Sequence, residues 1–204
     1  MKEMNEIRYM VKPEWVSWDS ISECQRLAHK TNNAKGFHMK VQDMTGEEIN
    51  RFIGDGVCFI ALDGNTVVGI TALVKKKINR WWVKGNVALL SCMTAVLPEY
   101  RNTDVNLELV IMRNEFWKKS NVETMYLSTA EDNKLIQKMA RRTGAKYVQY
   151  SASGKGATYY SVVMARWKNG CSFPDWFCSF MFWLSKILIR TIWKPGYIFR
   201  LSAH

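Results

Sequence analysis

The chain has 204 residues, the length of one ordinary domain with a short addition. With 48% hydrophobic and 23% charged residues, it has the composition of a folded globular protein, which excludes a disordered tail or a low-complexity linker. Its 29 lysines and arginines outnumber 18 acidic residues, so the net charge is +11. This excess predicts an anionic partner: nucleic acid, a phosphate-bearing cofactor or an acidic membrane face.

The first part of the chain predicts one strand and two helices. Residues 6–11 alternate weakly in polarity, as in a strand. Residues 15–34 have helical spacing, and Ser20 with Glu23 forms a potential capping box. Thr45 and Glu48 form a second capping box, which opens a short helix that we expect to end near residue 54.

A β region follows. The apolar runs 57–62 and 66–74 are joined by Asp63-Gly64, a hairpin turn signal. Residues 75–84 are basic and aromatic, and we interpret them as a loop that is either solvated or in contact with a phosphate, an acidic acceptor or nucleic acid. No nucleic-acid-binding motif accompanies this loop, so we do not expect nucleic acid as the partner. The apolar run 87–96 predicts a strand covered on both faces.

Helices and strands alternate after this run. We expect helices over residues 103–119 and 131–143, the second with Leu135, Ile136 and Met139 toward a core. Between and after them, strands are predicted over residues 122–129, 147–150 and 158–167, the last two joined by a turn around residues 153–156. The element order predicts one α/β domain over residues 1–167, with a mixed, mostly antiparallel sheet flanked by helices.

Residues 168–204 differ in composition from the rest and predict a C-terminal aromatic and basic amphipathic helix, with Asp175 at its N-cap. A membrane span is disfavoured, because the apolar run 176–189 contains a lysine and is shorter than the roughly 20 residues a bilayer requires. Two alternatives stay open: a helix on an anionic membrane surface, or a helix docked on protein. The segment 173–199 contains nine aromatic residues, and its basic residues Lys186, Arg190 and Lys194 are four apart.

Cysteine and histidine usage predicts a reducing, cytoplasmic compartment and no metal site. The five cysteines are odd in number and none forms a CxxC pair. The three histidines, His29, His38 and His204, are widely separated. The N-terminus is charged and is not followed by an apolar segment, so no signal peptide is expected. If the C-terminal helix binds a membrane, the protein would be peripheral on its inner face.

The segment from Val96 to Leu109 carries the strongest functional pattern. It reads Val-x-Pro-Glu-Tyr-Arg-Asn-Thr-Asp-Val-Asn-x-x-Leu, directly after the predicted buried strand and into a predicted helix. The start of a helix offers unpaired backbone N–H groups and the positive end of the helix dipole, both of which suit a diphosphate. The segment resembles the acyl-CoA-binding motif of the GCN5-related N-acetyltransferase (GNAT) superfamily. At the level of element order, the resemblance covers roughly residues 5–167.

The resemblance implies a GNAT-like acyl-CoA N-acyltransferase fold and a reaction between an acyl-CoA, acetyl-CoA being the expected one, and an amine acceptor, without a metal. It implies that Asn133, at the start of the helix over residues 131–143, contacts the pantetheine arm. The other cofactor-binding residues that it implies are Val96, Arg101, Asn102, Thr103, Asp104, Val105 and Asn106.

The sequence departs from the family pattern in several places. The motif's three glycines are replaced by Asn102, Asp104 and Asn106, and Ala140 stands where the family often has a tyrosine that protonates the leaving thiolate. The family's frequent glutamate base has no counterpart at residues 89–91. Either Thr103 or Asp104 caps the helix, or the loop is rearranged and Arg101 and Thr103 still contact phosphate.

No catalytic residue is assigned. Polar candidates near the expected cleft are Ser91, Cys92, Tyr126, Ser128 and His38, of which Cys92 is expected in the core and His38 in a solvated loop. We expect an acyl-CoA-dependent N-acyltransferase, in which water relays the proton of the amine. The alternative is a catalytically silent relative that acts as a binding or assembly component of a larger complex or virion.

Overall fold

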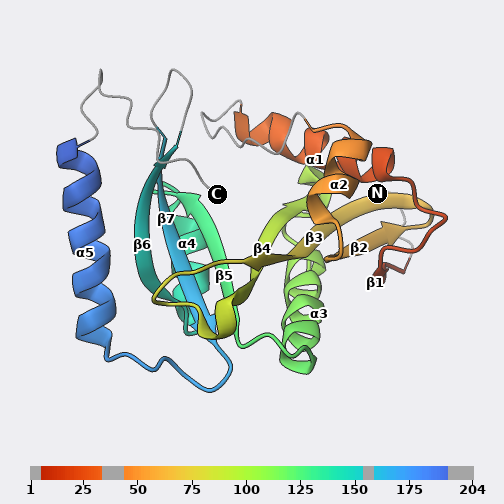
Figure 1. The fold of residues 1–204 in the computed structure, drawn as a ribbon. Helices are drawn as coiled ribbons and strands as arrows, with labels where there is room; N and C mark the ends of the chain where they lie inside the picture. Colours follow the sequence, from red (N-terminus) through yellow and green to blue (C-terminus); the bar gives the residue numbers. More distant parts are fainter. Residues whose placement is uncertain (1–5, 34–43, 154–158, 193–204) are drawn as a thin grey trace. The chain divides into compact units, whose positions relative to one another are not determined.

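The computed structural model describes residues 6–33, 44–153 and 159–192 (Figure 1). Internal contacts divide the chain into two compact units: residues 1–79 with 85–122 form the first unit, and residues 80–84 with 123–204 form the second. Helices accompany antiparallel strands in both units, so the predicted α/β fold with a mostly antiparallel sheet flanked by helices is confirmed.

The first unit has four antiparallel strands in chain order: β1 (Arg8–Val11), β2 (Val57–Asp63), β3 (Thr66–Lys77) and β4 (Val87–Val96). The predicted turn at Asp63-Gly64 is confirmed, with Gly64 at a φ of 57°. The prediction of a loop from residue 75 is wrong, because β3 continues to Lys77 and pairs there with Val87. The strand accommodates these lysines because Lys75 and Lys77 are exposed, while the ammonium of Lys76 lies over the ring of Phe52 at 4.9 Å from its centroid.

Helices cover both faces of this sheet (Figure 1). Residues of α1 (Trp18–Asn33) and α2 (Gly46–Ile53) share a buried cluster with Ile60 of β2. The neighbouring residue Phe59 points to the other face, where its ring meets Phe116 of α3 (Val105–Lys119) at a centroid distance of 5.7 Å. The alternation of side chains along β2 thus separates the helices into two layers.

The two predicted capping boxes have different outcomes. The box of Thr45 and Glu48 is confirmed: each side chain accepts a backbone N–H of the other residue. The box at Ser20 is wrong, because α1 begins before it and the N–H of Ser20 donates to Ser17 Oγ at 3.1 Å. Glu23 instead pairs with Arg26 one turn further along the helix.

The second unit has strands in the order β5 (Thr124–Ala130), β7 (Tyr159–Trp167) and β6 (Lys146–Ser153), all antiparallel. The predicted turn between β6 and β7 lies largely outside the described residues. The predicted helix over residues 131–143 is α4 (Lys134–Arg142). Of its predicted core residues, Ile136 and Met139 are half-buried, but the prediction is wrong for Leu135, which is 68% exposed. The helix buries the polar residue Gln137 in addition to its apolar side.

Residues 80–84 pack into the second unit and do not form a solvated loop. Trp82 is 3% exposed, and its backbone carbonyl accepts the indole N–H of Trp167 at 2.9 Å. The ring of Trp81 meets those of Phe173 and Phe177 edge-on, each at 5.3 Å. The tryptophans of the predicted basic loop therefore stabilise the fold.

The predicted C-terminal helix is present as α5 (Asp175–Ile192), which lies along the edge strand β6 (Figure 1). Asp175 is its first residue, not its N-cap, and pairs with Lys146 of β6. The N–H of Tyr150 in β6 donates to Ser185 Oγ at 2.9 Å, which covers one polar group of the sheet edge. Among the described helices, none has the length and apolar character that a membrane crossing requires. The predicted contributions of Trp193, Lys194, Tyr197 and Phe199 lie outside the described residues.

Gly69 of β3 allows α3 to approach the sheet closely. A Cβ atom at this position would lie 2.8 Å from Val105 Cγ1 and 3.0 Å from Leu109 Cδ1, both in the first turns of α3. Both of these side chains are fully buried. The absence of a side chain at residue 69 thus determines how deeply the start of α3 sits on the sheet.

We therefore expect Gly69→Ala to lower the free energy of unfolding by about 1–3 kcal/mol, because the new methyl group overpacks the contact. Urea denaturation measures this change. Val105→Ala in the Gly69→Ala background should recover part of the loss, since it removes the nearest atom. A strictly additive double variant would contradict the close contact.

Candidate cofactor-binding site

The candidate site is the turn that joins β4 to α3 in the first unit. The chain leaves β4 at Val96, passes through one 3-10 turn, η3 (Pro98–Tyr100), and enters α3 at Val105. The N–H of Leu97 still donates to the carbonyl of Val68 in β3, at 2.9 Å. The turn therefore begins at a point fixed by the sheet.

Tyr100 anchors this turn to the hairpin between β2 and β3. Its hydroxyl donates to Asp63 Oδ2 at 2.6 Å, and both side chains are buried. The hydrogen bond to Asp63, together with burial, raises the pKa of Tyr100 to about 12. The hydroxyl thus stays protonated and keeps donating across the physiological pH range.

The Arg101 side chain is directed toward α1. Its Nη2 donates to the carbonyl of Ala28 at 2.6 Å, and its Nε donates to the carbonyl of Val96 at 3.4 Å. His29 is buried nearby, and burial followed by the positive charge of Arg101 lowers its pKa. Arg101 therefore ties α1 to the end of β4, while its predicted contact with phosphate stays a prediction. A buried imidazole beside this arginine could not be foreseen, since the two are far apart in sequence.

The start of α3 is only partly capped. The hydroxyl of Thr103 donates to the carbonyl of Tyr100 at 2.6 Å and accepts the N–H of Val105 at 3.4 Å. Asp104 occupies the N-cap position, but its carboxylate accepts no backbone hydrogen bond. Of the two residues expected to cap the helix, Thr103 therefore makes the contact and Asp104 does not. In the described part of the chain, the N–H groups of Asn106 and Leu107 have no acceptor. Unpaired N–H groups at a helix start are donors for an anion.

Acidic side chains near the start of α3 would repel an anion bound there. Asp104 precedes α3 and Glu108 lies in its first turn, and both are close enough to Tyr9 to raise its pKa, after the larger effect of burial. Acidic groups stabilise the positive end of a helix dipole but repel a diphosphate placed there. The turn thus combines suitable donors with an unfavourable local charge.

A bulge interrupts β4 before the turn. Ile70 pairs with Ala95 and Ala72 pairs with Cys92, so two residues of β4, Met93 and Thr94, lie opposite a single residue of β3. Met93 has a φ of 56°, which is uncommon for a residue with a side chain. No sequence signal indicates this conformation, because methionine does not mark turns as glycine does.

Two contacts hold the bulge in place. The side-chain amide of buried Gln25 in α1 donates to the carbonyl of Met93 at 3.1 Å, and the hydroxyls of Thr71 and Thr94 lie 2.9 Å apart. A bulge removes backbone groups from regular ladder pairing. Such groups can polarise a carbonyl when they are fixed in place before the reaction.

The polar candidates from the sequence do not yield a catalytic base. Ser91 is buried in β4, and burial raises the pKa of the half-buried Cys92 thiol to about 12, which leaves it protonated. The ring of Tyr126 packs on Trp82 at 5.2 Å in the second unit, and Ser128 is exposed. His38 lies outside the described residues.

Asn133 belongs to the second unit, where it caps α4. Its side-chain oxygen accepts the N–H of Ile136 at 3.3 Å. Ala140, which stands where the resemblance implies a tyrosine, is buried in the same helix. The contact of Asn133 with pantetheine stays a prediction.

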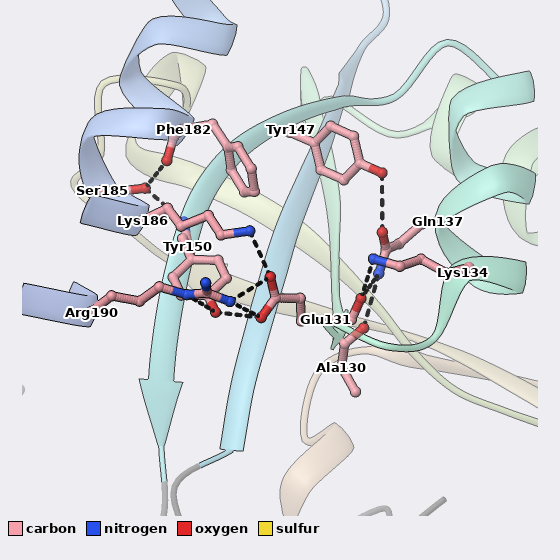
Figure 2. Close-up of polar contacts among 10 residues, drawn as sticks. All are labelled: Ala130, Glu131, Lys134, Gln137, Tyr147, Tyr150, Phe182, Ser185, Lys186 and Arg190. Atoms are coloured by element: carbon pink, nitrogen blue, oxygen red, sulfur yellow. Dashed lines mark hydrogen bonds and ion pairs between the residues drawn. The ribbon is translucent and has the colours of Figure 1, made fainter. Parts of the chain in front are cut away.

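Glu131 is the centre of a polar cluster in the second unit (Figure 2). Its carboxylate accepts from the hydroxyl of Tyr150 at 2.5 Å, from Lys186 Nζ at 2.6 Å and from Arg190 Nη2 at 3.0 Å. Burial raises its pKa, but the hydrogen bonds from Lys186, Tyr150 and Arg190 outweigh burial and lower it to about 2. Two cations of the predicted basic stripe on α5 are thus bound within their own unit.

Comparison with known proteins supports the fold. No protein-family model and no curated protein matches this sequence. A probable acetyltransferase from Staphylococcus epidermidis is similar in structure, with a TM-score of 0.61 at 13% identity over 79% of this chain and 99% of that chain. A GNAT-family acetyltransferase from Streptococcus pneumoniae has a TM-score of 0.57 at 12% identity over 79% of this chain and 99% of that one.

A third similar structure is that of the NatC complex bound to Gag peptide and CoA, with a TM-score of 0.60 at 13% identity over 80% of this chain and 99% of that chain. These likenesses show that the chain has the fold of GNAT acetyltransferases. The predicted GNAT-like fold is thus confirmed, at a sequence identity of 12–13% to these structures.

The anchor at Tyr100 leads to a prediction about stability. Tyr100→Phe removes the hydroxyl and leaves a buried carboxylate without one of its donors, so we expect the free energy of unfolding to fall by about 2 kcal/mol. Urea denaturation of the two proteins near neutral pH measures this. An unchanged midpoint and slope would show that the hydrogen bond does not hold the turn.

The Glu131 cluster leads to a prediction about pH. Folding lowers the pKa of Glu131 from 4.5 to about 2. The contribution of Glu131 to the free energy of unfolding is therefore complete above about pH 4.5 and is lost as the pH falls toward 2. We expect Glu131→Gln to lower the free energy of unfolding by about 2 kcal/mol near neutral pH, and this difference to shrink in acid.

Glu115→Gln is the matched control, since Glu115 pairs with Lys118 on an exposed surface. Its effect should stay within about 0.5 kcal/mol. If the two variants unfold alike at every pH, the Glu131 cluster does not stabilise the second unit.

Proposed function

We propose that this protein is an acyl-CoA-dependent N-acyltransferase that moves an acyl group, with acetyl as the expected one, from CoA to an amine. One observation carries the proposal: among the described residues, the N–H groups of Asn106 and Leu107 have no acceptor, and they lie at the start of a helix that follows a bulged strand. The fold of GNAT acetyltransferases, seen in a complex that binds CoA, supports it.

In this proposal the diphosphate of CoA accepts hydrogen bonds from the first turn of α3. The expected contacts are the residues implied by the resemblance, namely Val96, Arg101, Asn102, Thr103, Asp104, Val105 and Asn106, with Asn133 on the pantetheine arm. Placement of a flexible substrate on fixed donors supplies much of the catalysis, because it removes the entropic cost of orientation.

The chemical step is attack of the amine nitrogen on the thioester carbonyl carbon. Backbone groups of the bulge at Met93 would stabilise the oxyanion that forms, and the C–S bond then breaks to release the CoA thiol. Water relays the proton from the amine, in keeping with the buried or packed state of Ser91, Cys92 and Tyr126.

A specific observation also favours the alternative, a catalytically silent protein with a role in binding or assembly. Arg101 already donates to two backbone carbonyls, and Asp104 and Glu108 place negative charge at the helix start. In this alternative the turn is a structural element that has lost affinity for CoA.

The C-terminal segment 168–204 is proposed as an addition to the acyltransferase domain of residues 1–167. The contacts of α5 with β6 support docking on the second unit, while its outward side chains stay available to a membrane or a protein partner. We place the protein in the cytoplasm, in peripheral contact with the inner face of a membrane.

CoA binding distinguishes the two functions. A ligand that binds only the folded state raises the melting temperature, so we expect millimolar CoA to raise it. Asp104→Asn should enlarge the shift and lower the Kd for CoA about threefold to tenfold, because it removes a negative charge beside the diphosphate. Calorimetric titration measures the Kd.

Glu115→Gln removes the same charge at the far end of α3 and should leave the Kd unchanged. If neither the wild-type protein nor Asp104→Asn responds to millimolar CoA, the acyltransferase proposal fails and the silent alternative holds.

A further inference from the structure

The outward side of α5 carries a continuous apolar stripe. Its members, Trp176, Phe180, Trp183 and Ile187, are 69%, 48%, 57% and 39% exposed. They are four, three and four residues apart, which places them within about 60° of the helix circumference. We call these four residues the outer stripe.

The opposite side of α5 is fixed to its own unit. Ser185 accepts the N–H of Tyr150, the ring of Phe182 packs on Tyr147 at 5.0 Å, and Cys178 is 2% exposed. Glu131 holds two cations at the border of the helix (Figure 2). These contacts prevent α5 from turning its apolar stripe inward, so the stripe is held facing away from β6.

Charge is distributed very unevenly between the two units. The second unit has 14 lysines and arginines against four acidic residues, a net charge of +10, whereas the first has 15 against 14. Nearly all of the chain's excess of +11 thus belongs to the unit that carries the outer stripe. If two copies of the protein associated through this stripe, two units that each have a net charge of +10 would meet. Electrostatic repulsion therefore opposes self-association through the stripe.

We propose that the outer stripe binds an anionic lipid surface, with α5 lying in the plane of the membrane interface. Tryptophan and phenylalanine prefer the boundary between headgroups and acyl chains, and an exposed convex helix can insert them there without a preformed groove. The positive charge of the second unit supplies the attraction to acidic headgroups. This inference assigns the proposed peripheral membrane contact to four named side chains, and it does not depend on the proposed acyl transfer.

Vesicle flotation of the full-length protein tests the proposal. We expect the wild-type protein to float with vesicles of phosphatidylcholine and phosphatidylglycerol, to stay in solution with phosphatidylcholine alone, and to dissociate at high salt. Trp176→Ala with Trp183→Ala should lower the partition coefficient about tenfold or more, because it removes the two most exposed rings of the outer stripe.

Trp15→Ala is the matched control, since Trp15 is 59% exposed but belongs to the first unit. It should bind vesicles as the wild type does, and all variants should keep the wild-type melting temperature. Equal flotation of the double variant and the wild type would overturn the proposal, as would a failure of the wild type to bind anionic vesicles. A dimer in light scattering that the double variant abolishes would assign the stripe to self-association instead. CoA titration of the double variant stays a separate readout of the proposed function.

Discussion

The hydrogen bond between Tyr100 and Asp63 is the constraint on which the candidate site depends. It connects the turn after β4 to the hairpin between β2 and β3, and both groups are buried. Gly69 adds a steric condition, because its missing side chain lets α3 settle on β3. Together these two features determine where the first N–H groups of α3 point, and therefore whether a diphosphate can reach them.

The local charge at this helix start sets the site apart from a favourable phosphate-binding loop. Asp104 and Glu108 stabilise the helix dipole, while Arg101 is engaged by backbone carbonyls of the first unit. The acidic groups that stabilise the turn therefore also lower its affinity for an anionic ligand. The protein binds CoA only if the hydrogen bonds from the free backbone N–H groups outweigh the repulsion by the acidic side chains. CoA binding therefore depends on these N–H groups.

Much of the fold could be predicted from the sequence, because local signals control it. Apolar runs predicted the strands on either side of the Asp63-Gly64 turn, and the capping box at Thr45 predicted the start of α2. The wrong predictions have a common cause, because they depend on tertiary packing, which the local sequence pattern does not indicate. Lysines at the end of β3 continue a strand because the backbone ladder continues, and Leu135 is exposed because α4 buries Gln137 instead.

The candidate site was only partly predictable. The motif from Val96 to Leu109 indicated the turn correctly, yet it could not show that the Asp104 carboxylate accepts no backbone N–H of the helix. The bulge at Met93 depends on Gln25, which is distant in sequence, so no local pattern indicates it. The spacing of Lys186 and Arg190 predicted a basic stripe on one face of α5, but it could not show that Glu131 binds both cations within the second unit.

The most direct test of the account is the contribution of the backbone N–H of Asn106 to CoA binding. Asn106→Pro removes this donor in the first turn of α3, where no intrahelical hydrogen bond depends on it, whereas Asn106→Ala keeps the donor and removes only the side chain. We expect calorimetric titration to show a Kd for CoA that rises about tenfold or more in Asn106→Pro and stays near the wild-type value in Asn106→Ala. Equal affinity of the two variants for CoA would show that the start of α3 does not bind the diphosphate.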